Sequence, residues 1–174
     1  LQETRPYKKS IMTSRSFKHE LGSFRALHEV LSNFACSCAL KLRKQNTRAK
    51  KLILFIQTNR FRSDVKSHYG SLEVDFPIAT NDSIEIVKAT YMALDKIYDK
   101  SCAYKRAGVI LSDIIPDQQV QLNLFGKYDV EKRTKLMKVY DDVNRKMGEG
   151  TIRLCIQGIE NKWGEKQAPI SFGH

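Results

Sequence analysis

The sequence lacks the long apolar segments that mark membrane and secreted proteins. No stretch of its 174 residues approaches the roughly 20 uninterrupted apolar residues of a membrane-spanning helix. No basic start is followed by an apolar run, so we expect no secretory signal, no membrane partner and a cytoplasmic protein. Because the chain starts at Leu1 and not at methionine, we also expect it to be a piece of a longer protein.

Residues suited to metal binding or catalysis are scarce. The four histidines are scattered, and the four cysteines have no zinc-site spacing: Cys36, Cys38, Cys102 and Cys155. Cys36 and Cys38 lie among apolar residues of a predicted helix, where a small buried side chain in a reducing compartment is the expected role. No Gly-rich phosphate loop, paired carboxylates or Ser/Cys–His arrangement is visible. We therefore expect no catalytic residue, metal or cofactor in this chain, and no enzyme activity of its own.

Positive charge is abundant and unevenly distributed. The formal net charge is +11, and residues 1–66 carry 15 Lys/Arg against 4 Asp/Glu, whereas residues 67–174 carry 15 against 15. A concentrated basic field attracts polyanions and accelerates their association. A merely solubilising surface explains a lone basic run equally well, so the charge alone does not decide the function.

The pattern of apolar residues predicts an α+β domain over residues 1–116. Strand patterns and helix patterns alternate in the order β-α-β-β-α-β, at 9–17, 24–42, 51–57, 70–76, 82–97 and 104–112. This order predicts a four-stranded antiparallel-type sheet with two helices on one face and the other face open. Ser23 and Asp82 are the expected N-caps. The expected buried stripes are Phe24, Leu27, Val30, Leu31, Phe34, Ala35, Cys38 and Leu42 in the first helix, and Ile84, Val87, Tyr91, Leu94 and Ile97 in the second.

The chain changes character after Pro116. A polar linker, 117–127, leads to an appendage, 128–174, with a helix at about 129–147 and a short strand at 151–157. The expected buried stripe of that helix is Leu136, Val139, Tyr140, Val143 and Met147.

A glutamine and three large apolar residues, Gln121, Leu122, Leu124 and Phe125, occupy the linker outside any periodic element. One interpretation is an extended peptide whose anchors fill a pocket on another protein. The other is that these residues strap the appendage to the main domain. The residues alone favour neither.

Several motifs together resemble one family. Gln121–Phe125 resembles the bacterial sliding-clamp-binding pentapeptide, and Ser14–Phe17, Lys41–Arg43 and Tyr104–Val109 resemble segments of a Y-family polymerase little finger. The tail motifs Leu136-Met137, Asp141, Asn144, Gly148-x-Gly150-Thr151 and Trp163 are similar to those of UmuC-type polymerases. The resemblance covers essentially the whole chain. It identifies the chain with the C-terminal part of a UmuC-type Y-family translesion DNA polymerase.

The resemblance implies DNA binding through phosphates and docking on the sliding clamp through Gln121, Leu122, Leu124 and Phe125. The DNA-binding candidates are Ser14, Arg15, Ser16, Arg60, Arg62, Lys105 and Arg106. A regular strand places Ser14 and Ser16 opposite Arg15, and a bulge reverses this, so the sequence leaves their faces open.

The resemblance also implies a longer parent that is a DNA-directed DNA polymerase using Mg²⁺ in SOS damage tolerance, with processed UmuD and the recombinase filament as partners. Two alternatives remain. The first is a split-βαβ RNA-binding module with Phe55 and Tyr104 as stacking candidates. The second is a protein-interaction adaptor whose basic patch is incidental.

Overall fold

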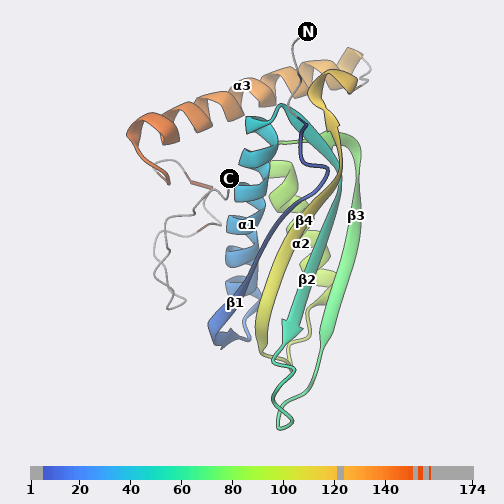
Figure 1. Cartoon of the computed structure of the whole chain (residues 1–174), viewed down its shortest axis with the longest axis vertical. Helices are drawn as coiled ribbons and strands as arrows, with labels where there is room; N and C mark the ends of the chain where they lie inside the picture. The colour runs from blue at the N-terminus through green and yellow to red at the C-terminus, as the bar shows by residue number, and fades with distance from the viewer. Residues whose placement is uncertain (1–5, 121–123, 151–152, 155–156, 158–174) are drawn as a thin grey trace.

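The computed structural model describes residues 6–120, 124–150, 153, 154 and 157 (Figure 1). In chain order its elements are β1 Ile11–Leu21, α1 Phe24–Lys44, β2 Thr47–Thr58, β3 Tyr69–Thr80, α2 Ser83–Ile97, β4 Tyr104–Pro116, a short 3-10 turn at Asp117–Gln119 and α3 Leu124–Met147.

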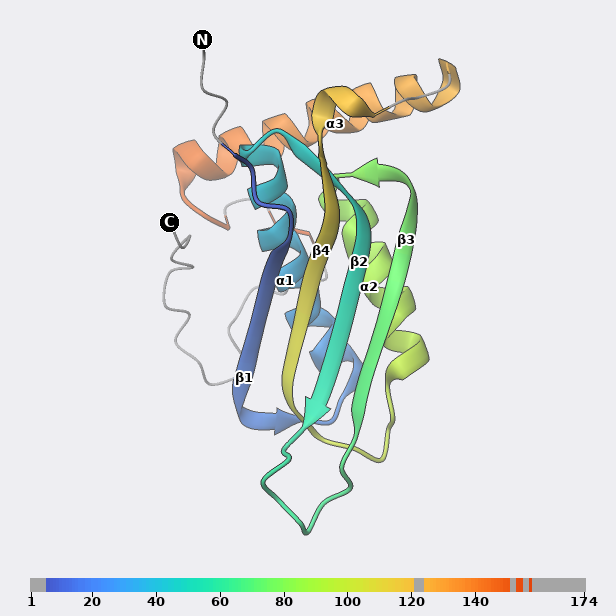
Figure 2. The same cartoon turned by 45° about the vertical axis from the view of Figure 1, so that its right-hand side comes forward.

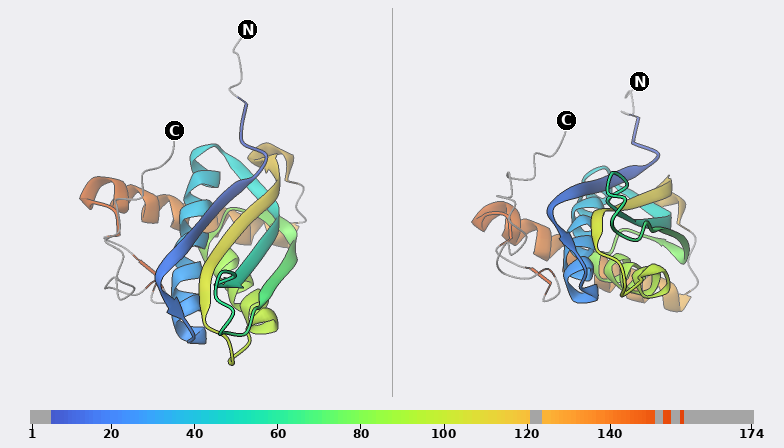
Figure 3. Two further views of the ribbon diagram at one scale, coloured as in Figure 1. Left: turned by 60° about the horizontal axis from the view of Figure 1, so that its bottom comes forward. Right: turned by 90° about the horizontal axis from the view of Figure 1, so that it is seen from below.

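The four strands form one antiparallel sheet in the order β1-β4-β2-β3. Figure 2 shows the sheet with α1 and α2 packed together behind it. The other face carries no helix in the part of the chain that the structure describes, as the views of Figure 3 also show. The predicted fold class, a four-stranded antiparallel sheet with two helices on one face, is confirmed.

The core lies between the sheet and the two helices. Strand residues that alternate along the chain point into it, as Leu52, Leu54 and Ile56 do on β2. The predicted stripe of α1 faces these strands, and Leu27 and Leu31 are fully buried. Cys36 and Cys38 are buried, as expected of small apolar side chains, and burial raises the pKa of the Cys36 thiol to about 12.

Both predicted N-caps are present. The Ser23 hydroxyl accepts a hydrogen bond from the backbone N–H of Ala26 (3.4 Å), and the Asp82 carboxylate accepts from Ile84 (2.7 Å) and Glu85 (3.4 Å). These oxygens pair with N–H groups that have no partner inside the helix. Helices α1 and α2 therefore begin where the sequence indicates.

The strands run further than predicted, and Pro77 does not end β3. The register between β2 and β3 shifts between the pairs Lys51–Asp75 and Ala49–Thr80, so the segment around Pro77 bulges out of the ladder. A proline is tolerated there because no ladder bond needs its missing N–H. β4 likewise continues through Asp113, whose φ is 50°, to Pro116.

The expected buried stripe of α2 is partly wrong. Val87 and Leu94 are buried as predicted, but Ile86 and Ala93, which were not predicted, are fully buried as well and Tyr91 is exposed. The Tyr91 ring packs edge-on against the rings of Phe24 and His28 at the rim of the α1–α2 contact. An amphipathic tyrosine is stable at such a rim because its ring packs while its hydroxyl stays wet.

The expected stripe of α3 is partly wrong, since only Tyr140 and Val143 of its members are half-buried. The helix begins at Leu124, ahead of the predicted start at 129. Met137 is 2% exposed, whereas Leu136, Val139 and Met147 are exposed. Of the predicted strand 151–157, the described residues 153, 154 and 157 lie outside any strand.

Ion pairs explain the orientation of α3, which crosses the end of the molecule where α1 ends and α2 begins (Figure 1). The Arg43 guanidinium, with a side chain 10% exposed, donates from Nε and Nη2 to the two carboxylate oxygens of Asp141 (2.7 and 2.9 Å). Arg133 pairs with Asp82 (3.2 Å) on the same side of the helix. These polar contacts turn Asp141 and Met137 toward the body, and Leu136, Val139 and Met147 away from it.

Among the described helices, none is apolar over a length that could cross a bilayer.

Candidate nucleic-acid interface

The strand register assigns side chains to the open face of the sheet. Because side chains alternate along a strand, residues paired across strands share a face. Four cross-strand rows point to the open side: Ser16–Arg106–Gln57–Tyr69, Ser14–Gly108–Phe55–Ser71, Met12–Ile110–Ile53–Glu73 and Ser112–Lys51–Asp75.

These rows divide the open face into two ends of different charge. The first two rows form what we call the cationic end, which lies beside the β2–β3 loop. The last two rows lead to the acidic end, where Lys51 Nζ contacts Glu73 (2.6 Å), Asp75 (3.8 Å) and Asp113 (3.9 Å). The hydrogen bond to Glu73 raises the pKa of Lys51. A polyanion is therefore attracted to one end of this face and not to the whole of it.

Ser14, Ser16 and Arg106 come together at the cationic end. The β1–β4 register is continuous from Ile11 to Ser16, so no bulge intervenes and both serines lie on the open face. Nη2 of Arg106 donates to the Ser14 hydroxyl (3.4 Å), and Arg106 makes no ion pair with any described residue. Arg15 pairs with Ala107, which is buried on the helix side, so Arg15 lies on the opposite face.

Lys105 is held by the backbone of β1. Its Nζ donates to the carbonyl of Phe17 and to that of Lys18 (3.3 Å). The β2–β4 register shifts between Gln57 and Thr58, opposite Lys105. Lys105 thus adds positive charge at this end of the sheet while fixing the irregular end of β1.

Arg60 and Arg62 lie in the β2–β3 loop, at the same end of the sheet. Arg62 is bound by two carboxylates, Asp64 (2.7 Å) and Glu20 (3.2 Å), and the hydrogen bonds that it donates to Asp64 raise its pKa. Arg60 is exposed and its guanidinium lies 5.4 Å from the ring centroid of Phe61. The loop therefore contributes Arg60 more directly than Arg62 to any contact with an anion.

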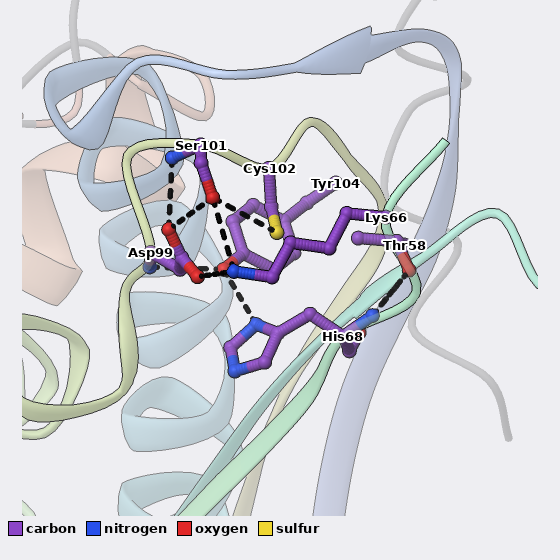
Figure 4. A network of polar contacts seen from close by, with 7 residues as sticks. All are labelled: Thr58, Lys66, His68, Asp99, Ser101, Cys102 and Tyr104. Carbon is purple, nitrogen blue, oxygen red and sulfur yellow. Dashed lines mark hydrogen bonds and ion pairs between the residues drawn. The ribbon is translucent and has the colours of Figure 1, made fainter. Parts of the chain in front are cut away.

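Polar contacts tie the β2–β3 loop to the α2–β4 turn (Figure 4). Lys66 Nζ donates to Asp99 (2.6 Å) and to Ser101 (3.2 Å), and the hydrogen bond from Lys66 holds the pKa of Asp99 well below its usual range. His68 Nδ1 lies 2.7 Å from the Tyr104 hydroxyl. The left view of Figure 3 shows the loop beside the turn.

Tyr104 is fully buried, and desolvation raises its pKa to about 12. It therefore does not lie on the open face where a stacking residue is needed, and that part of the RNA-binding alternative is wrong. Tyr69, which the sequence analysis did not single out, occupies the open face instead. The alternation of Tyr69, Ser71 and Glu73 along β3 could have indicated that these three side chains share one face. The residues that lie next to Tyr69 on that face could not be predicted, because they depend on the register between β2 and β3.

Folding neutralises part of the basic segment before residue 67. Five of its 15 Lys and Arg residues pair with carboxylates, most of them from the second part of the chain: Arg43 with Asp141, Arg48 with Asp117, Lys51 with Glu73, Arg62 with Asp64 and Glu20, and Lys66 with Asp99. The charge asymmetry of the sequence is thus not a single basic patch on the surface.

Of the clamp-peptide candidates, Gln121 and Leu122 lie outside the described residues. Leu124 and Phe125 belong to the start of α3, which crosses the end of the molecule opposite the cationic rows (Figure 1). No His, Cys, Asp or Glu cluster suited to a metal occurs among the described residues.

An open antiparallel sheet face that carries serines and an arginine without an ion pair among the described residues offers the kinds of group that contact a sugar-phosphate backbone. The chain belongs to the impB/mucB/samB family: the family's C-terminal domain matches residues 8–124. A domain of unknown function, DUF4113, matches residues 134–171.

Two curated relatives from Salmonella typhimurium are similar along 98% of the chain. Protein UmuC is 31% identical over 172 residues, and Protein SamB is 32% identical over 173 residues. The chain spans about two fifths of each, 41% and 40% respectively.

Two solved structures have similar folds. One, described as the insertion ternary complex of Dbh DNA polymerase, has a TM-score of 0.47 and 16% identity, covering 64% of this chain and 31% of that one. The other is a complex of the beta-clamp processivity factor and the little finger domain of PolIV, with a TM-score of 0.47 and 9% identity. It covers 66% of this chain and 97% of that one.

Proposed function

We propose that the chain is the DNA-binding and clamp-docking C-terminal region of an error-prone translesion DNA polymerase that acts in SOS damage tolerance. The family membership and the motif resemblance support the parent activity. The observation that carries the DNA-binding part is Arg106, a cation without an ion pair among the described residues, between the serines of an open sheet face.

The proposed contact is with phosphates of the primer-template duplex. Ser14 and Ser16 are small, and β1 is an edge strand in which every second backbone N–H points away from β4. Phosphate oxygens can approach those N–H groups because no bulky side chain intervenes. Arg106, with Lys105 and Arg60 at the same end of the sheet, adds affinity, because each cation that neutralises a phosphate releases condensed counterions. Phosphate contacts are indifferent to sequence, which suits an enzyme that must hold damaged duplex.

A salt titration tests this proposal. Fluorescence anisotropy of the whole chain with labelled duplexes of unrelated sequence should give equal affinities that fall steeply with salt. Arg106→Gln should weaken binding and flatten the plot of log K against log salt by about one unit, because one phosphate contact is lost.

Arg15→Gln is the matched control. It removes the same charge from the neighbouring strand but on the opposite face, and should leave the slope unchanged. Salt-insensitive binding, or equal effects of the two substitutions, would contradict the proposed contact.

We place clamp docking at Gln121, Leu122, Leu124 and Phe125. Arg106 and Pro116 lie ten positions apart on β4, which at strand geometry places the cationic end about 30 Å from the end of β4 that precedes the peptide in the sequence. The duplex and the clamp would therefore be held at opposite ends of the domain.

Leu124→Ala combined with Phe125→Ala should abolish binding to purified sliding clamp while the circular dichroism melt stays unchanged. Asn123→Ala, at the variable position of the motif, should bind normally. Unfolding of the double variant would support the alternative in which these residues strap the chain together.

The remaining expectations concern the parent. By the family resemblance, its catalytic carboxylates and Mg²⁺ would lie outside this chain. Processed UmuD and the recombinase filament are proposed as partners on the family resemblance alone. A protein that copies bacterial DNA would act in the cytoplasm.

A further inference from the structure

An exposed tyrosine lies on the open face at the cationic end. Tyr69 is 61% exposed, although its ring stacks on Phe55 at a centroid distance of 6.4 Å and an interplanar angle of 24°. Phe55 is only 9% exposed. The buried ring thus orients the exposed one, so that little conformational freedom is left for a ligand to remove.

The surroundings of Phe55 make room for this arrangement. A Cβ on Gly108 would lie 2.5 Å from two ring carbons of Phe55 and 2.7 Å from Cβ of Ser14. The ring therefore occupies the space that any larger residue at 108 would need. The guanidinium of Arg106 lies over the same ring, 5.6 Å from the Phe55 centroid, within cation–π range. An aromatic surface and a cation are thus adjacent.

Packing within the described residues does not account for the exposed Tyr69 ring. It lies on β3, the edge strand opposite β1, and shares its cross-strand row with Gln57, Arg106 and Ser16. A solvent-exposed aromatic ring beside a cation without an ion pair is the combination that binds single-stranded nucleic acid, in which bases stack on the ring and phosphates meet the charge. The acidic end, with Glu73 and Asp75, excludes phosphates from the other half of the face.

We infer that Tyr69 is a stacking site for an unpaired nucleobase of the strand that leaves the duplex on the open face, while Arg106 contacts an adjoining phosphate. This inference rests on the proposed function and adds a second kind of contact to it. Stacking distinguishes a single-stranded extension from blunt duplex, which phosphate contacts alone do not.

The test compares blunt duplex with the same duplex carrying a single-stranded extension. The whole chain should bind the extended DNA more tightly. Tyr69→Ala should remove that preference, weakening binding to extended DNA roughly 5- to 100-fold, which corresponds to the loss of one base–aromatic stack. Binding of Tyr69→Ala to blunt duplex should be unchanged, and its salt slope should equal the wild-type slope because no charge is lost.

Two further variants separate stacking from structural effects. Tyr69→Phe keeps the ring and should behave as wild type, and a 2-aminopurine in the extension should lose fluorescence on binding to wild type and to Tyr69→Phe only. Tyr91→Ala removes an exposed tyrosine from the helix layer and should not alter the preference.

The outcomes distinguish the inference from the proposed function. If the wild-type chain binds neither DNA, the proposed function is wrong. If it binds both and Tyr69→Ala retains the preference for extended DNA, the proposed function stands and the stacking site is wrong. Should Tyr69→Ala lower the melting temperature, Tyr69→Leu provides the same test with an apolar strand residue.

Discussion

Gly108→Ala should destabilise the protein, because the open face is already filled at that point. The added Cβ would come within 2.5 Å of the Phe55 ring and 2.7 Å of Ser14 Cβ, closer than such atoms approach in proteins. The ring cannot swing aside freely, since Tyr69 stacks on it and Arg106 lies over it. Overpacking of this kind costs about 1–3 kcal/mol. For a chain of this size, each kcal/mol lowers the melting temperature by roughly 2–4 °C.

Urea unfolding followed by circular dichroism measures the effect. Gly22→Ala is the matched control, because its Cβ would meet only the Cys102 carbonyl oxygen at 3.8 Å, an ordinary contact. That variant should be as stable as wild type or slightly more stable, since alanine restricts the unfolded chain. Phe55→Leu in the Gly108→Ala background should cost less than the sum of the two single changes. A Gly108→Ala protein as stable as wild type, with additive energies in the double variant, would refute the assigned register and packing.

Three shorter predictions follow from other contacts. Asp141→Asn removes the charged partner of Arg43 and should cost about 1–3 kcal/mol, seen as faster hydrogen exchange in α3; unchanged protection would mean that the pair does not hold the helix. Burial lowers the pKa of His28 despite a backbone hydrogen bond to Val87, so the unfolded chain binds the proton more readily. Stability should therefore be highest above the unfolded pKa of about 6.5 and fall as the pH drops through it, and His28→Gln should flatten this dependence between about pH 8 and pH 5.5; an equal slope would contradict it. Arg62→Gln should change the salt slope of DNA binding less than Arg106→Gln does, because Asp64 and Glu20 already bind Arg62.

The fold was predictable because local signals and periodicity agree over the first domain. Ser23 and Asp82 cap the helices where expected, and the alternation along β2 separates buried from open residues. The end of β3 was wrongly predicted at Pro77, because the effect of a proline on a strand depends on a bulge that forms only with the partner strand. Helix and strand identity is thus a local property here, whereas strand length is not.

The site was less predictable because it depends on pairing between distant strands. The sequence could not decide whether Ser14 or Arg15 faces the open side, and the unbroken β1–β4 register decides it. Tyr69 acquires its place only when β3 pairs with β2, which brings it against Phe55.

The buried side of α3 was predicted partly wrongly for a different reason. Its apolar stripe predicted the buried side, but the ion pair between Arg43 and Asp141 selects another side. Buried charge pairs cannot be read from hydrophobic periodicity, because the partner lies 98 positions away in the sequence.

Site-directed photo-crosslinking tests most directly the claim that DNA lies on the open face at the cationic end. A benzophenone attached to Ser16→Cys should crosslink bound duplex. The label is attached in a Cys155→Ser background, in which the native cysteines that remain, all among the described residues, are buried and should not react with it. The same label on Met92→Cys, exposed on the helix layer, should crosslink little or none. Crosslinking from Met92→Cys and none from Ser16→Cys would contradict the account.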